Sequence, residues 1–122
     1  DGAQLASSGN GAQLASSGNG AQLASSGDGA QLASSGNGAQ LASSGYGAQL
    51  ASSGNDCVVC AAGIDSIAKA KVGSWITLSE WRYDSKKQKN VPVCVKTEQV
   101  DGERIKEDTF YKIENGEFVE VK

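Results

Sequence analysis

A nine-residue unit, Gly-Ala-Gln-Leu-Ala-Ser-Ser-Gly-Asn, repeats without a gap through residues 2–55 of this 122-residue chain. Only its last position varies, and that position is occupied in turn by Asn10, Asn19, Asp28, Asn37, Tyr46 and Asn55. Nine residues make about two and a half turns of an α-helix, so successive leucines would face opposite sides and form no apolar stripe. A straight strand fails for a related reason, because its side-chain period is two and nine is odd. Each unit must therefore contain both a strand and a turn.

Within the first unit, the strand is predicted over residues 3–7 and the turn over residues 8–11. Alternation puts Ala3 and Leu5 on one face of the strand, and Gln4 and Ala6 on the other. Glycine and asparagine in the turn supply the positive φ that a sharp corner needs. One unit per coil would leave almost no interior, whereas two units per coil give two short parallel sheets across a thin core. The sequence thus predicts an all-β fold, a β-roll-like parallel β-solenoid with two nine-residue units per coil.

This arrangement divides the repeated side chains into an inner and an outer set. The predicted solenoid core contains Leu5, Leu14, Leu23, Leu32, Leu41, Leu50 and Val59. The predicted outer ladder contains Gln4, Gln13, Gln22, Gln31, Gln40 and Gln49. Two alternatives stay open, because uncharged Gly/Ser-rich repeats are also typical of flexible linkers and because open strand edges favour aggregation. The leucine at every ninth position favours the ordered solenoid, since a linker does not need it.

The repeat continues in degraded form to residue 72, after which the composition changes. Residues 56–64 align with one more unit, in which Val59 takes the leucine position. Val58 and Ile67 replace outward glutamines, so we expect another element to cover the outer face there. Residues 74–83, 91–98, 108–113 and 118–121 are rich in β-branched and aromatic side chains, which is typical of strands. We therefore predict two domains, the solenoid at residues 1–72 and a small antiparallel β meander that caps it at residues 73–122.

The chain offers little chemistry for catalysis or metal binding. It contains no histidine, which is the commonest acid–base catalyst and transition-metal ligand. Cys57 and Cys60 have the spacing of half a zinc site or of a redox pair, but zinc needs four ligands and redox pairs of this type begin helices. Small buried side chains in alanine positions are the favoured interpretation. The Asn-rich corners resemble those of calcium-binding rolls, but only Asp28 is acidic. We expect no catalytic residue, no metal and no cofactor.

Charge is distributed very unevenly along the chain, whose net charge is −3. Residues 1–55 hold only Asp1 and Asp28, while the other 12 acidic and all 11 basic residues lie in residues 56–122. The first half therefore has no field to attract nucleic acid or an anionic membrane, and no stretch approaches the about 20 apolar residues of a membrane span. We predict a protein partner or a second copy of the chain, with no nucleic acid and no membrane. The candidate contact residues are Tyr46, Trp75, Trp81 and Tyr83, although the cap aromatics are also suited to a cap core.

Three segments of the cap carry a resemblance to known proteins: GSWITLSEW at residues 73–81, VDGERIK at residues 100–106 and NGEFVE at residues 115–120. Together with the nonapeptides they resemble an uncharacterised bacterial and phage family of Ala/Ser/Gly-rich nonapeptide-repeat proteins with a C-terminal β cap. The resemblance implies a bacterial, phage or prophage origin and an upstream domain, and it implies no activity. The odd number of cysteines, three, adds the expectation of a reducing, cytoplasmic location.

These observations predict a non-enzymatic structural or interaction module, a rigid solenoid scaffold that self-associates. One alternative is a phage-type inhibitor that binds a host protein through the aromatic residues of the cap. Another is a surface binder of ice or carbohydrate, because regular Ser and Gln ladders on flat parallel sheets resemble the arrays of ice-binding solenoids.

Overall fold

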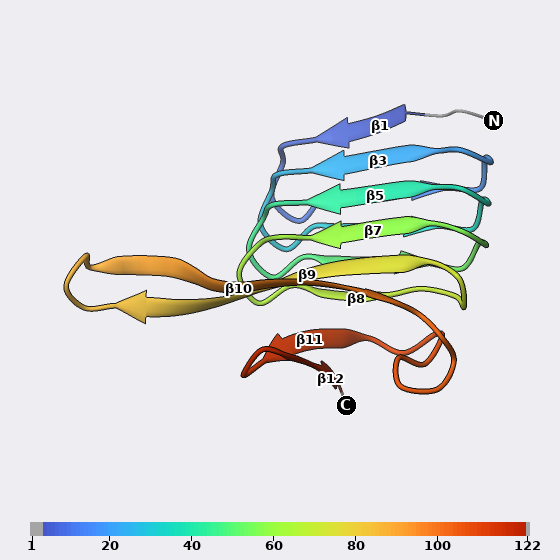
Figure 1. Cartoon of the computed structure of the whole chain (residues 1–122). Coiled ribbons are helices and arrows are strands. Elements are labelled where there is room, and N and C mark those ends of the chain that lie inside the picture. The colour runs from blue at the N-terminus through green and yellow to red at the C-terminus, as the bar shows by residue number, and fades with distance from the viewer. Residues whose placement is uncertain (1–3, 122) are drawn as a thin grey trace.

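The computed structural model describes residues 4–121 and contains twelve strands and no helix in that range (Figure 1). Eight short strands follow the repeat units: β1 (Gln4–Ser7), β2 (Gln13–Ser16), β3 (Gln22–Ser25), β4 (Gln31–Ser34), β5 (Gln40–Ser43), β6 (Gln49–Ser52), β7 (Val58–Ala61) and β8 (Ile67–Lys69). Four more strands complete the chain: β9 (Trp75–Asp84), β10 (Lys89–Gln99), β11 (Tyr111–Glu114) and β12 (Glu117–Glu120). The predicted all-β solenoid is confirmed.

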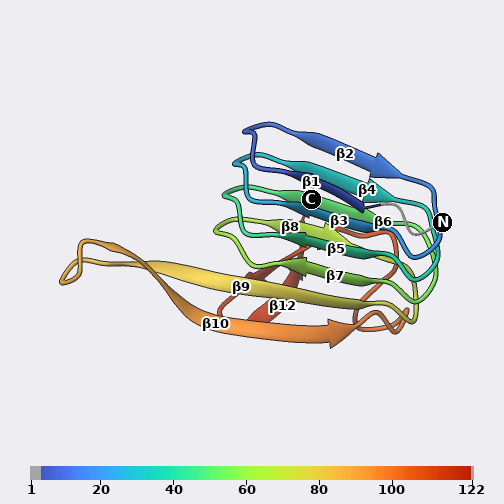
Figure 2. The ribbon, with the colours of Figure 1, turned by 90° about the horizontal axis from the view of Figure 1, so that it is seen from above.

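From β1 to β9, consecutive strands alternate between two six-stranded sheets; β10 then stays in the sheet of β9, and β11 and β12 both belong to the other sheet. Sheet A has the order β1-β3-β5-β7-β9-β10, and sheet B has the order β12-β11-β8-β6-β4-β2. Within each sheet, repeat strands pair in parallel and in register with the strand two units away, so that Leu23 lies beside Leu41 and Leu32 beside Leu50. One coil therefore contains two units, as predicted from the need for an interior. The coils stack into a ladder of nearly parallel rungs (Figure 2).

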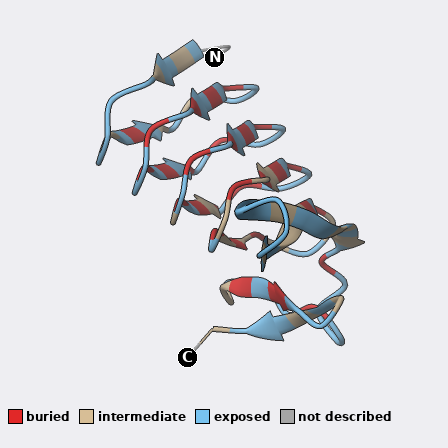
Figure 3. Cartoon of the chain, turned by 90° about the vertical axis from the view of Figure 1, so that its left-hand side faces the viewer, coloured by how far each residue is buried: buried red, intermediate tan, exposed pale blue. Residues whose placement is uncertain are grey.

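Side-chain alternation buries the leucines between the two sheets. In β3, Leu23 and Ser25 are buried, whereas Gln22 and Ala24 are exposed. Ala21, at the position where the sequence predicted the strand to begin, lies just before β3 and is fully buried. The buried leucines and alanines form one continuous column along the stack, and Figure 3 shows the buried positions alternating with exposed ones along the strands. The core is thin, because each coil contributes only a few small side chains and two leucines, each worth about 2 kcal/mol of burial.

The glycine that follows the asparagine position of each corner adopts a left-handed backbone. Its φ is 69° at both Gly29 and Gly38. The sequence predicted that the asparagine would share this role, but within residues 4–121 no corner asparagine of the repeat units has positive φ. In the two degenerate units, Asp56 and Asp65 replace this glycine with φ values of 56° and 57°. Aspartate is among the few non-glycine residues that tolerate this conformation.

The glycine that precedes the asparagine position is required by stacking instead of by φ. A Cβ atom on Gly36 would overlap the carbonyl oxygen of Gly18 in the preceding coil. A Cβ atom would overlap the carbonyl oxygen of the glycine 18 residues earlier in the same way at Gly27, Gly45, Gly54 and Gly63. Backbone therefore approaches backbone at these corners more closely than any side chain allows.

The cap continues each sheet with one antiparallel hairpin, where the sequence predicted a single meander. β9 pairs in parallel with β7 from Trp75 to Leu78, so the parallel stack extends one strand past residue 73. β9 then runs on beside β10 beyond the coils, and the two strands form an arm that projects from the solenoid (Figures 1 and 2). β11 pairs with β8 and β12 in sheet B. Residues 100–110 cross between the sheets and bury Val100 and Ile105, and this crossing keeps β10 and β11 apart.

Candidate binding surface

In each sheet, the predicted core residues lie on the inner face and the predicted ladder residues lie on the outer face. Leu23, Leu32, Leu41, Leu50 and Val59 are fully buried, Leu14 is almost so, and Leu5 in the first described strand is only partly buried. All six glutamines of the predicted outer ladder are exposed. The outer face of the six exact repeat units is therefore an uncharged array of glutamine, alanine and serine columns, which Val58 and Cys60 continue in sheet A and Ile67 and Lys69 continue in sheet B.

The asparagines at the corners hold the coils together through their side chains. Asn19 Oδ1 accepts a hydrogen bond from the backbone N–H of Asn37 at 3.0 Å, and Asn37 Oδ1 accepts one from Asn55 at 2.8 Å. Asp28 Oδ1 accepts the N–H of Tyr46 in the same way at 3.1 Å. The sequence analysis missed this ladder, although the interchange of Asn and Asp at one position was a signal for a side-chain oxygen acceptor.

Tyr46, a predicted contact residue, is half-exposed and tied to the next coil of its own chain. Its hydroxyl donates a hydrogen bond to Asp65 Oδ2 at 2.9 Å. This hydrogen bond and the charge of Asp65 raise the pKa of Tyr46. The contact adds a side-chain hydrogen bond between Tyr46 and the following coil to those of the corner ladder.

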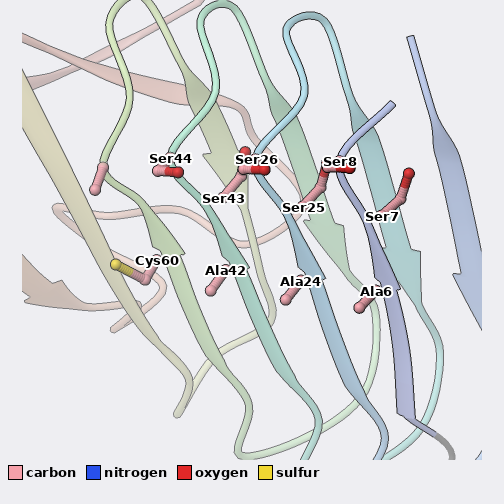
Figure 4. A pocket seen from close by; sticks show the side chains of 11 residues that line it. Ala6, Ser7, Ser8, Ala24, Ser25, Ser26, Ala42, Ser43, Ser44 and Cys60 are labelled. Atoms are coloured by element: carbon pink, nitrogen blue, oxygen red, sulfur yellow. The ribbon is translucent and has the colours of Figure 1, made fainter. Parts of the chain in front are cut away.

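A shallow trough runs along the outer face of sheet A, across the coils. Figure 4 shows its floor of alanine side chains, with Ala6, Ala24 and Ala42 in one column that Cys60 continues. Serine hydroxyls line one side of this trough, which has a volume of about 690 Å³. Within residues 4–121 there is no cluster of three or more His, Cys, Asp or Glu side chains placed to hold a metal ion. The trough offers methyl groups and hydroxyls but no nucleophile beside a base.

The two closely spaced cysteines do not form a joint site. Cys57 is buried in the core, where its Sγ donates a hydrogen bond to the carbonyl of Gly36 at 3.4 Å. Cys60 lies on the outer face, and burial raises the pKa of its thiol. A raised pKa keeps this thiol protonated near neutral pH and therefore weakly nucleophilic. Cys57, just before β7, and Cys60 within β7 thus face opposite sides of sheet A, which is the arrangement of small side chains along a strand.

Four large side chains on the outer face of sheet A remain exposed where the solenoid meets the cap. We call Val58, Trp75, Tyr83 and Val95 the apolar patch; their exposed fractions are 47%, 46%, 59% and 64%. Val58 lies beside Trp75 in the sheet, and Val95 is paired with Ser79 in the same row of outward positions. The expectation that another element covers Val58 is wrong, because β9 extends the sheet edge and leaves the outer face open. The sequence analysis did not name Val58 or Val95 as contact residues.

Trp81, another predicted contact residue, is held against the solenoid by hydrogen bonds of its own side chain. It is half-buried, and its indole Nε1 donates hydrogen bonds to the carbonyl of Ala62 at 3.2 Å and to Ser79 Oγ at 2.7 Å. Ser79 Oγ in turn donates to the same carbonyl at 2.6 Å. Trp81 therefore fixes the base of the arm to the edge of the trough, while Tyr83 lies further out along β9.

The tip of the arm is strongly basic. Residues 82–89 contain Arg82, Lys86, Lys87 and Lys89 but only one acid, Asp84, so they carry a formal charge of +3. The rest of the chain then carries −6, because the total is −3. The ion pairs of the described residues use other cations, namely Lys71, Lys96, Arg104, Lys106 and Lys112. Asp84 Oδ1 accepts the backbone N–H groups of Lys86 and Lys87 and thereby shapes the turn.

Acidic residues gather at the other end of β9 and β10. Residues 98–108 contain five acids and two bases, a formal charge of −3. Arg104 donates a hydrogen bond to Glu98 at 2.6 Å and lowers the pKa of that carboxyl group. Asp101 accepts the backbone N–H groups of Glu103 and Ile105, which lower its pKa. Residues 98–108, from the end of β10 into the crossing between the sheets, thus form a fixed, acidic stretch, which we call the acidic crossing segment.

Comparison of the chain with protein-family models, with curated proteins and with solved structures finds no match. The resemblance to the bacterial and phage nonapeptide family therefore stays a prediction. None of the described residues belongs to a helix of the length and hydropathy needed to cross a membrane.

Proposed function

We propose that this chain is a non-enzymatic structural scaffold, in which a rigid solenoid holds the cap and its arm at a set distance and orientation. The observation that supports this most directly is the uninterrupted in-register stack, in which every coil is bonded to the next. Backbone pairing and the corner side-chain ladder both follow the 18-residue period. The proposal also agrees with the chemistry of the trough, which lacks a nucleophile–base pair.

A second candidate function is binding of a protein partner through the cap. The specific observation in its favour is the apolar patch, because exposed Trp and Tyr side chains on a fixed surface are the residue types that dominate binding energy at protein interfaces. The two functions are compatible, since a scaffold needs a contact surface.

The scaffold proposal predicts that the length of the solenoid can be changed in whole coils. Inserting one more coil, GAQLASSGNGAQLASSGN, after Asn19 should lengthen the particle by about 4.8 Å without lowering its melting temperature. Small-angle X-ray scattering would measure the length, and circular dichroism the β content and melting. The matched control is an insertion of the same composition in scrambled order at the same place, which should melt earlier. An unchanged particle length, or equal behaviour of both insertions, would contradict a stacked scaffold.

A further inference from the structure

We propose that two copies of this chain associate face to face through the outer face of sheet A, with the apolar patch at the centre and with antiparallel strands. In this arrangement the basic arm tip of each copy lies over the acidic crossing segment of the other. The inference rests on the proposed scaffold function and deepens it, because it names the occupant and the geometry of its contact surface.

The first argument is the position of the exposed apolar side chains. Eight large hydrophobic side chains are exposed among the described residues, and the four of the apolar patch share one sheet face. Their row also contains Thr77 and Thr97, whose hydroxyls hydrogen-bond to each other at 2.9 Å and so leave less unsatisfied polarity on the face. A flat sheet face with aromatic and β-branched side chains is suited to packing against a second sheet.

The second argument is charge, which selects the orientation of the second copy. The arm tip (+3) and residues 98–108 (−3) lie at opposite ends of β9 and β10 (Figures 1 and 2). A two-fold axis in the interface and perpendicular to the strands reverses the strand direction. It therefore brings each basic tip toward the partner's acidic segment. A two-fold axis parallel to the strands would instead bring the two basic tips together, which is unfavourable.

The third argument is that the alternative route to self-association, edge-to-edge pairing, is obstructed at the end of sheet A. β10 is the edge strand, and it contains Pro92 and a register shift between Pro92 and Cys94. Lys89 and Lys96 flank this irregular stretch. Proline, bulges and lysines are the devices that prevent an edge strand from pairing with another sheet. At this end of the sheet, where the apolar patch lies, association is therefore expected through the face.

The size of the surface indicates a weak dimer. Nine residues of β9 span about 30 Å, and three strands span about 14 Å, which gives roughly 400 Å² of sheet around the apolar patch. A typical stable interface buries about 800 Å² per partner. The uncharged trough extends the same face toward the first coils and supplies further contact area. A concentration-dependent equilibrium between monomer and dimer is therefore the expected behaviour.

The test is sedimentation equilibrium of the whole chain over a series of concentrations. The doubly substituted variant Trp75→Ser/Val95→Ser should raise the dimer dissociation constant by about tenfold or more, with unchanged circular dichroism because both side chains are exposed. The matched control is Val119→Ser, which removes an exposed valine from sheet B and should leave the dissociation constant unchanged.

A charge exchange tests the orientation. An arm variant (Lys86→Glu, Lys87→Glu, Lys89→Glu) and a loop variant (Glu103→Lys, Glu107→Lys) should each be monomeric alone. Mixed together they should form a heterodimer, because both arm–loop contacts are again between opposite charges. A wild-type chain that is monomeric at every concentration, or a dimer that none of these variants weakens, would overturn the inference. Neither result would affect the coil-insertion test, so the scaffold proposal is judged separately.

Discussion

Substitution of Gly36 by alanine should destabilise the solenoid by about 3 kcal/mol or more, which is large for a single added methyl group. The new Cβ would overlap the carbonyl of Gly18, and a backbone atom cannot move aside as the end of a flexible side chain can. The coils on either side would have to separate, which would weaken strand pairing in both sheets. Urea unfolding followed by circular dichroism measures the loss.

The matched control lies two residues away at Gly38. A Cβ at this position would have no heavy atom within 4 Å, but the residue has a φ of 69°. Gly38→Ala should therefore cost only the strain of a left-handed residue, about 1–2 kcal/mol. Gly38→Asp should cost less, because Asp56 and Asp65 adopt this conformation at the equivalent corners. Equal losses for Gly36→Ala and Gly38→Ala would show that the corners are not in close backbone contact.

Substitution of Leu32 by alanine should lower the free energy of unfolding by about 2–5 kcal/mol. Leu32 is fully buried between Leu14 and Leu50 in sheet B, and a core this thin has no other large side chain to fill the space. Since ordinary domains are stable by about 5–15 kcal/mol, the variant should lose a large part of its stability. Thermal and urea unfolding provide the measurement.

Leu5→Ala is the internal comparison for this effect. Leu5 has a neighbouring rung only on one side among the described residues and is partly buried, so its truncation should cost about 1 kcal/mol. A graded series from Leu5 to Leu32 is therefore expected. If the two truncations were equally mild, the leucines would not form the continuous buried column described above.

The coil itself could be predicted from the sequence because its period leaves few solutions. A nine-residue repeat with one leucine excludes a helix and a straight strand, and two units per coil then follow from the need for an interior. The register of the degenerate units was also readable, since Val59 lies beside Leu41 and Ile67 beside Gln49 as the alignment predicts. These features depend on local alternation and on spacing along the chain.

The cap was less predictable, because its arrangement depends on which strands meet in space. Turn signals such as Asn115-Gly116 specify a hairpin between β11 and β12, but they do not say which sheet the hairpin extends. The strand pattern of β9 likewise does not reveal that its first four residues complete the solenoid while its end projects as an arm. The apolar patch follows from that projection. For this reason the sequence identified Trp75 and Tyr83 but could not associate them with Val58 and Val95.

Thiol cross-linking tests the 18-residue coil most directly. In a background with Cys57→Ala, Cys60→Ala and Cys94→Ser, the pair Gln22→Cys and Gln40→Cys should react rapidly with a short bifunctional thiol reagent. Their backbones lie on neighbouring rungs of sheet A, about 4.8 Å apart. The pair Gln22→Cys and Gln31→Cys is closer in sequence but lies on the outer faces of opposite sheets, and it should not react within one chain. Equal or faster cross-linking of the second pair would contradict the two-unit coil.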